Sequence, residues 1–100
     1  MSNPTDSQVK QRELLGAIAT IYRSSGWLVT DLHCNKANPV AVSGPDFLML
    51  RWGTMRAVKG LAKGELSGPQ QKMKAEYTDC GCEWRTYYPH MFRDIADDAE

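Results

Sequence analysis

The sequence predicts an α/β domain, a mixed sheet flanked by helices, in the order helix, three strands, helix, strand, helix. Three observations support this fold class. Residues 7–25 repeat apolar side chains every three or four positions, as an amphipathic helix does. Residues 47–59 contain two largely apolar segments around a tight turn, which predicts a β-hairpin. The strand–helix–strand pattern over 55–88 then requires a parallel pair joined by a right-handed crossover.

Length and composition predict a single domain. One hundred residues, 42% apolar and 24% charged, can bury one hydrophobic core but not a second. We expect this domain to cover residues 1–100, with flexible ends at 1–6 and 97–100. No apolar run approaches the roughly 20 residues that span a bilayer, and the polar start is unlike a signal peptide. We therefore expect a soluble, cytoplasmic protein with no membrane partner.

The charges balance overall but are unevenly distributed. Twelve basic residues match twelve acidic ones, which argues against a tight, non-specific nucleic-acid coat. From Arg93 onward the chain has one basic and four acidic residues, which leaves eleven basic and eight acidic residues before it. A modestly basic body could still face phosphates, with an affinity that salt would weaken.

The first helix is expected over 7–25, with Val9, Leu14, Ile18 and either Ile21 or Tyr22 as its apolar stripe. Glu13 borders this stripe, and from the residues alone it is a solvated surface glutamate. The sequence Ser24-Ser25-Gly26 supplies the end of the helix.

Three strands should follow. We expect strands over 27–32, 47–50 and 55–59, with a polar loop over 33–43 and the second strand buried on both faces. If the hairpin turns at 52–54, Asp46 lies opposite Lys59, and position 57 is a diagonal neighbour of Asp46 at about 7–8 Å. Because side chains alternate along a strand, Ala57 and Lys59 share one face, while Arg56 and Val58 take the other.

The second half should contain a helix, a strand and a last helix. Ser67 and Gln70 match a capping box, which predicts a helix from there to about Cys80. Met73, Tyr77 and Cys80 would form its buried stripe. A strand is expected over 82–88, ended by Pro89, and a helix over 91–99.

The three cysteines, Cys34, Cys80 and Cys82, match no disulfide framework and are expected to be reduced. A small zinc protein that uses the cysteines with His90 or His33 is a weak alternative, because the spacing is not a standard zinc pattern.

Asp46 and Lys59 suggest metal-dependent phosphodiester hydrolysis. Such chemistry needs two or three oxygen ligands around a divalent metal, which polarises the phosphate and activates a water molecule. Asp46 and the backbone carbonyl of Val58 could supply oxygens to Mg²⁺, and Lys59 could orient the water or neutralise developing charge. Glu13 and Gln70 could complete the site from the flanking helices. Taken singly, an aspartate after proline such as Asp46 is common in turns, and a lysine at a strand end such as Lys59 is usually solvated.

The order of these positions resembles the VRR-NUC nucleases of the PD-(D/E)xK superfamily. The resemblance covers about Glu13 to Tyr88 and rests on short motifs, which are Glu13, Gly44-Pro45-Asp46, Ala57-Val58-Lys59, Leu66-Ser67 and Gln70. It implies a restriction-endonuclease-like fold and a Mg²⁺- or Mn²⁺-dependent endonuclease. Small stand-alone members of phages and bacteria are homodimers that cut branched DNA such as four-way junctions. A phage- or prophage-encoded protein of a bacterial host is therefore implied.

Carried over by residue, the resemblance makes Asp46 and Glu13 metal ligands, Lys59 the catalytic lysine and Gln70 a residue beside the site. The departure is Ala57, which stands where the family has the acidic residue of the (D/E)xK motif. Either the chain is a natural pseudo-nuclease that binds DNA without cutting, or alanine was introduced to disarm an active enzyme. We favour the introduced substitution, because the other site residues all remain.

Two surfaces follow from this hypothesis. Basic residues are available to contact DNA phosphates beside Lys59, namely Lys10, Arg12, Lys63, Lys72 and Lys74. Aromatic residues exceed what so small a core obviously needs, so some could form a dimer interface, with core packing as the alternative for each: Trp27, Trp52, Trp84, Tyr87 and Tyr88.

Overall fold

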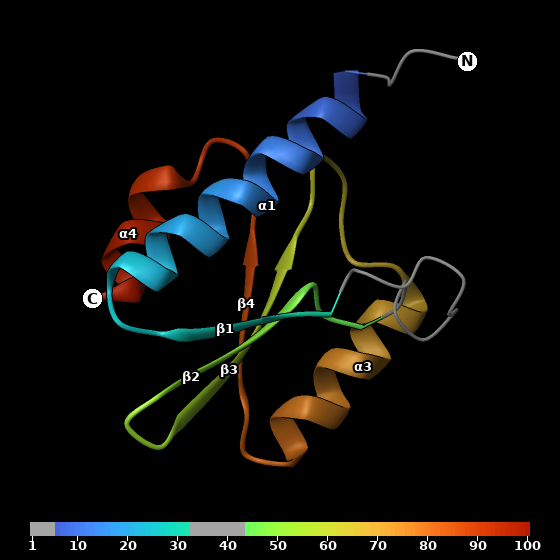
Figure 1. Ribbon diagram of the computed structural model, residues 1–100. Coiled ribbons are helices and arrows are strands. Elements are labelled where there is room, and N and C mark those ends of the chain that lie inside the picture. Colours follow the sequence, from blue (N-terminus) through green and yellow to red (C-terminus); the bar gives the residue numbers. More distant parts are fainter. Residues whose placement is uncertain (1–5, 33–43) are drawn as a thin grey trace.

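A computed structural model describes residues 6–32 and 44–100. It shows an α/β fold in which a four-stranded mixed sheet is flanked by helices, in the element order that the sequence predicts (Figure 1). The expected polar loop over 33–43 and most of the expected flexible start lie outside the described residues.

The sheet has the strand order β1-β2-β3-β4. Strands β1 (Leu28–Asp31), β2 (Phe47–Arg51) and β3 (Thr54–Gly60) form an antiparallel meander. Strand β4 (Glu83–Tyr87) pairs parallel to β3, as the predicted crossover requires. In the β2–β3 register Phe47 lies opposite Val58, which places Asp46 and Lys59 at the next pair of positions.

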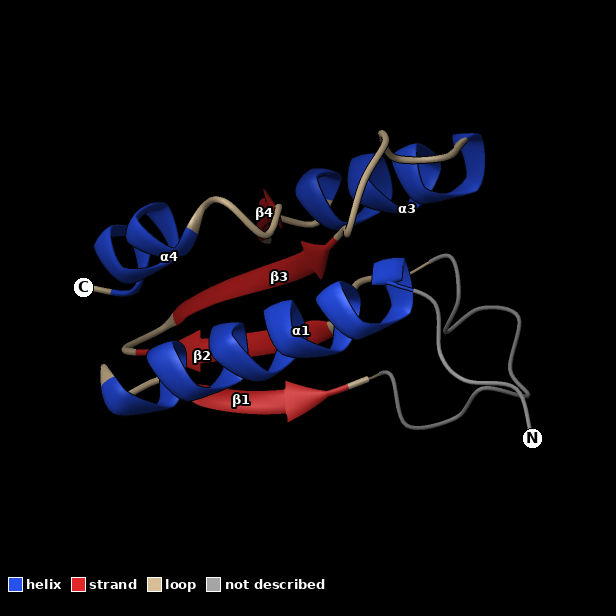
Figure 2. Ribbon diagram, turned by 90° about the horizontal axis from the view of Figure 1, so that it is seen from above, coloured by secondary structure: helices blue, strands red, loops and turns tan. Residues whose placement is uncertain are grey.

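The helices cover both faces of the sheet. Helices α1 (Asp6–Ser24) and α4 (Phe92–Ala99) pack against one face, where Leu14, Ile18, Val58 and Ile95 belong to the main core. Helix α3 (Gly68–Asp79) covers only part of the other face, where Ala57, Cys82 and Trp84 form a smaller cluster, and leaves the β1–β2 side of that face open. Seen from above, α3 and α4 lie on opposite sides of β4 (Figure 2).

Helix α3 is less buried than predicted. None of its residues is fully buried: Met73 and Tyr77 are half-buried, and Cys80, just beyond the helix, is exposed. The helix leaves beside it a groove of about 440 Å³ lined by Met55, Glu76, Tyr77 and residues 80–82. The prediction of a buried stripe was wrong because α3 contacts the sheet mainly through β4, as its neighbouring strand.

The same open face changes the prediction for β2. Phe47 and Met49 are buried beneath α1, whereas Leu48 is half-buried and Leu50 is exposed. Leu50 lies between Leu28 of β1 and Met55 of β3, and all three side chains are exposed. The strand is therefore buried on one face, and the expectation of burial on both faces was wrong.

The acidic end of the chain is held in place. The Trp27 indole donates a hydrogen bond to the carbonyl of Ala99 (2.8 Å). The Arg51 guanidinium donates to the carbonyls of Ala99 (2.9 Å) and Glu100 (2.7 Å). These two side chains satisfy carbonyls that the end of α4 leaves unpaired, while the flexibility expected for residues 97–100 stays a prediction.

Gly60 lets α1 approach the end of β3 closely. A Cβ atom at this position would lie 2.9 Å from Leu15 Cδ2 and 3.2 Å from Leu14 Cδ2. The missing side chain therefore brings the first helix next to the strand ends that carry Asp46 and Lys59. Across the described ranges, no helix is long and apolar enough to cross a membrane.

Candidate functional site

Asp46 and Lys59 form an ion pair where β2 begins and β3 ends. The Asp46 Oδ1 atom lies 3.5 Å from Lys59 Nζ, and Oδ2 accepts a hydrogen bond from the amide of Gly60 (2.9 Å). Asp46 is completely buried and Lys59 is 5% exposed. Asp46 and Lys59 therefore lie together as the hairpin register predicts. The pair is buried, and the lysine neutralises the carboxylate.

Ala57 lies two residues before Lys59 on the same face of β3, opposite Leu48. Its methyl group is buried with Cys82 and Trp84, beneath half-buried Leu48 and Tyr77. Arg56 and Val58 point to the other face, as predicted, so neither substitutes for an acidic residue at position 57. The position opposite Leu48, at which VRR-NUC nucleases have a carboxylate, thus holds an apolar group in this chain.

Helix α1 presents Gln11, not Glu13, to the strand end. The Gln11 amide donates to the carbonyl of Gly60 (2.6 Å). Glu13 is exposed and lines a separate cavity of about 400 Å³ with Lys10, Ala62, Pro89, His90 and others. At about 100° per residue, Gln11 and Glu13 point roughly 160° apart around the helix, so one of them must face away. The structure does not bring Glu13 to Asp46.

Gln70 closes the capping box that the sequence predicts. The side-chain oxygen of Gln70 accepts a hydrogen bond from the backbone amide of Ser67 (2.8 Å). The backbone amide of Gln70 donates to the Ser67 hydroxyl (3.3 Å). The side chain thus serves the start of α3, and its role beside the site stays a prediction.

The residues present do not fit a divalent metal. Asp46 is one buried carboxylate, with both oxygens turned to Gly60 and Lys59. The Val58 carbonyl, proposed as a further oxygen ligand, accepts the Asp46 amide in the strand pairing (2.9 Å). Within residues 6–32 and 44–100, no three His, Cys, Asp or Glu side chains gather as ligands. Two or three ligand oxygens are needed, so we derive no step through a metal for this sequence.

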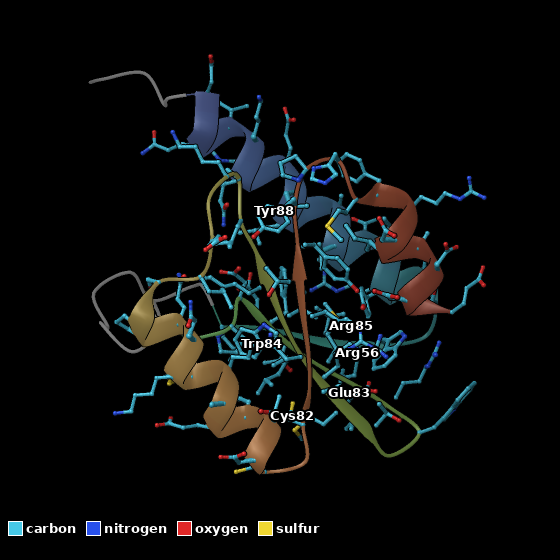
Figure 3. The ribbon with its side chains drawn as sticks, turned by 180° about the vertical axis from the view of Figure 1, so that it is seen from behind. Arg56, Cys82, Glu83, Trp84, Arg85 and Tyr88 are labelled. Carbon is cyan, nitrogen blue, oxygen red and sulfur yellow. The ribbon has the colours of Figure 1, made fainter. Side chains whose placement is uncertain are left out.

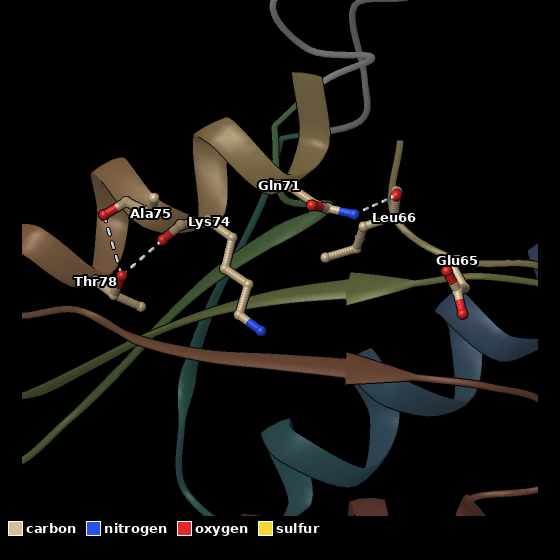
Figure 4. A pocket seen from close by; sticks show the side chains of 6 residues that line it. All are labelled: Glu65, Leu66, Gln71, Lys74, Ala75 and Thr78. Atoms are coloured by element: carbon tan, nitrogen blue, oxygen red, sulfur yellow. Dashed lines mark hydrogen bonds between the residues drawn. The ribbon is translucent and has the colours of Figure 1, made fainter. Parts of the chain in front are cut away.

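The basic side chains proposed to bind DNA are all exposed: Lys10, Arg12, Lys63, Lys72 and Lys74. Lys74 lines a cavity of about 520 Å³ between α3 and the preceding loop, with Glu65, Leu66 and Gln71 (Figure 4). The Gln71 amide donates to the Leu66 carbonyl (3.1 Å), which ties the loop to the helix. Exposure leaves these five cations available for phosphates.

Comparison with protein-family models, curated proteins and solved structures gave no match. The nuclease hypothesis therefore rests on the sequence motifs, the fold class and the geometry around Asp46.

The described cysteines do not form a zinc site with His90. Cys80 is exposed at the end of α3, and Cys82 is buried before β4, where burial raises the pKa of its thiol. His90 follows β4 and stacks on Tyr88. Five strand residues separate the two groups, about 17 Å at the rise of a β-strand, whereas zinc ligands lie about 2 Å from one ion. Cys34 and His33 are outside the described residues.

A buried polar network on the other face was not predicted from the sequence. Arg56 donates to the Tyr22 hydroxyl (3.1 Å), which lies 2.6 Å from the Tyr87 hydroxyl, and Tyr87 donates to Asp98 (2.8 Å). Arg56 also pairs with Glu83 (2.9 Å). Figure 3 shows Arg56, Glu83 and Arg85 side by side on the two parallel strands. The sequence feature that could have indicated this network is an arginine and two tyrosines, Arg56, Tyr22 and Tyr87, at positions that face the core. Such side chains need polar partners when they are buried.

Proposed function

We propose that this chain is a nuclease-type domain that binds branched DNA and, with alanine at position 57, does not cleave it. The observation that carries the proposal is the cluster of Asp46, Ala57 and Lys59 on one face of adjoining strands, with the Asp46–Lys59 pair at 3.5 Å. A carboxylate and a lysine at these positions are what metal-assisted phosphodiester hydrolysis requires, apart from the second acidic group. The exposed lysines and Arg12 support binding to DNA phosphates.

A glutamate at position 57 would supply that second acidic group. Residues 57 and 59 share a face of β3 and lie about 7 Å apart, so a glutamate could reach toward Lys59 and Asp46. Two carboxylates would then be available for Mg²⁺ or Mn²⁺.

Restoring the acidic residue tests the proposal. We expect Ala57→Glu to nick a synthetic four-way junction only when Mg²⁺ or Mn²⁺ is present, at least roughly 100-fold faster than the Ala57 chain. Ala57→Gln is the matched control, since it has the same size without the charge and should stay inactive. Adding Lys59→Met to the glutamate variant should abolish cleavage again. Circular dichroism would confirm that each variant is folded.

A second candidate is a naturally non-catalytic DNA-junction binder. The packing of Ala57 favours it, because the methyl group is completely buried with Cys82 and Trp84, in an apolar cluster where a carboxylate is costly. A folded Ala57→Glu variant that binds the junction and cuts it with neither metal would support this candidate and refute the disarmed nuclease. If the Ala57 chain does not bind branched DNA, both candidates are wrong.

We also propose that two copies of the chain associate through the uncovered sheet face. Leu28, Leu50 and Met55 form a row of exposed apolar side chains across three strands, and Leu28 is 65% exposed. Homodimer interfaces are rich in apolar surface, and a formal net charge of zero gives two copies no net charge repulsion. Of the aromatic residues considered for this role, Trp27, Trp84 and Tyr87 belong to the core instead.

A further inference from the structure

The turn between β2 and β3 holds a tryptophan where folding would favour another residue. Trp52 has φ 49° and Gly53 has φ 80°, and Trp52 is the residue other than glycine with a positive φ in the described parts of the chain. Two-residue turns with both central φ values positive favour Asn-Gly, and bulky side chains in this region are strained. Tryptophan at position 52 therefore strains the backbone of the turn. Strained residues of this kind are concentrated at binding and active sites.

The Trp52 ring is exposed but held on a fixed support. It is 91% exposed, and the Arg51 guanidinium lies 5.0 Å from its centroid. The same guanidinium lies 4.5 Å from the Trp27 ring and donates to the carbonyls of Ser25 and Ala99. Arg51 thus lies over both indoles. The turn lies at the end of the hairpin that is away from Asp46 and Lys59 (Figure 1). With 91% of Trp52 exposed, the other face of its ring is open to a ligand.

Trp52 is separate from the apolar row proposed for the dimer. Arg51, on which its ring lies, belongs to the face of the sheet that carries α1 and α4, because its guanidinium contacts Trp27 and Ala99. Leu50 and Met55 point to the opposite face. A single flat ring over a fixed cation suits another flat aromatic group better than a broad apolar protein surface, and an exposed nucleobase is such a group.

We propose that Trp52 stacks on an unpaired or exposed base at the branch point of DNA, an inference that rests on the DNA binding proposed above. Trp52 lies six residues from Asp46 along β2, about 20 Å at the rise of a strand. This length corresponds to roughly six nucleotide steps of about 3.4 Å. The end of the sheet that holds the buried Asp46–Lys59 pair would then lie beside a duplex arm, while Trp52 marks where that arm ends.

The charges near the turn give the stacking contact a distinct salt dependence. Helix α4 ends beside Arg51 and carries Asp94, Asp97 and Asp98 against Arg93, so its side chains have a net negative charge, and Trp52 itself is uncharged. Binding by Trp52 must come from the ring face. The contribution of Trp52 should therefore stay nearly constant with salt, whereas that of Lys72 or Lys74 should shrink.

The test is Trp52→Asn, compared with the unchanged chain on a synthetic four-way junction that carries 2-aminopurine at the branch, and on a linear duplex of the same sequence. We expect roughly 10-fold weaker junction binding and loss of the 2-aminopurine fluorescence change, with duplex binding altered less than about twofold. Unfolding should occur at an equal or higher urea concentration, because asparagine suits the turn. Trp52→Phe, which keeps a stacking ring, should retain most of the affinity.

Three results would overturn the inference. If Trp52→Asn binds the junction as tightly as the unchanged chain, DNA binding stands and the stacking role is wrong. If the variant instead converts a dimer to a monomer by light scattering, Trp52 is a protein contact. If the unchanged chain binds neither DNA, the proposed function and this inference fail together.

Discussion

Tyr87 is at the centre of the buried network between the sheet and α4. Because its hydroxyl donates to the Asp98 carboxylate, the adjacent Tyr22 hydroxyl must be the donor in their 2.6 Å contact, and Arg56 donates to Tyr22 in turn. Burial raises the pKa of Tyr87, and its hydrogen bonds to Tyr22 and Asp98 raise it further. Each hydroxyl proton is therefore fixed in a single chain from Arg56 to the carboxylate.

This arrangement predicts a loss of stability in alkali. Below a pH of about 10 Tyr87 is protonated in both folded and unfolded chains, so its contribution to stability is fully present. Above it the unfolded chain loses the proton and the folded chain keeps it, so the free energy of unfolding should fall by up to about 1.4 kcal/mol per pH unit. Urea unfolding measured between pH 7 and 11 would show this slope.

Tyr87→Phe should flatten that slope. It should also lower stability at pH 7 by about 1–3 kcal/mol, because Tyr22 and Asp98 lose a buried partner. Tyr88→Phe, which removes a neighbouring hydroxyl outside this network, is the matched control and should keep the slope. An unchanged slope in Tyr87→Phe would mean that another group controls alkaline unfolding.

Among the elements, α1 and β3 depend on each other through Gly60. The glycine allows Leu14 and Leu15 to pack over the strand end. Its carbonyl accepts a hydrogen bond from the Gln11 side chain of α1, and its backbone amide donates to Asp46. The position of α1 and the position of the Asp46–Lys59 pair therefore depend on the same residue. A side chain at position 60 would meet the ends of the Leu14 and Leu15 side chains, which would have to shift from their packed positions.

Gly60→Ala should therefore destabilise the protein by about 1–3 kcal/mol, since the new methyl group would meet Leu15 at 2.9 Å. Gly16→Ala is the matched control. Position 16 lies within α1, and a methyl group added there would have no atom within 4 Å, so alanine should stabilise the helix by about 0.5–1 kcal/mol. Thermal or urea unfolding would measure both. If both variants were more stable than the unchanged chain, α1 would be free to shift away from the strand end.

Local signals predicted the elements well and their orientation less well. The capping box at Ser67 and Gln70 and the hairpin register at Asp46 and Lys59 depend on residues close in sequence, and both are present. Which side of α1 meets β3 depends on Gly60, 49 residues from Gln11, so the sequence did not distinguish Gln11 from Glu13. The prediction of a buried stripe on α3 was wrong for a similar reason. Its burial depends on how far the helix covers the sheet, which no local pattern indicates.

At the scale of the whole molecule, the open sheet face predicts self-association. Leu50→Lys should convert a dimer to a monomer in multi-angle light scattering, because it places a charge in the middle of the row formed with Leu28 and Met55. Val9→Lys is the matched control, since Val9 is an exposed apolar residue of α1 outside this row. A monomeric unchanged chain, or equal effects of the two variants, would refute the proposed interface.

The candidate site was predicted only in part at this scale. Asp46, Ala57 and Lys59 could be placed from one hairpin, whereas the residues that anchor α4, such as Arg51 and Trp27, act across more than 45 positions of sequence. Pairing of this kind leaves no local pattern in the chain. The open face and the exposed Trp52 likewise follow from where the helices end.

The anchoring of α4 has an electrostatic consequence. The Arg51 guanidinium donates to the carbonyls of Ala99 and Glu100 at the end of α4. The carbonyls at the end of a helix form the negative pole of its dipole. Arg51 thus places a cation at the negative pole of α4, which favours this helix in addition to the hydrogen bonds themselves.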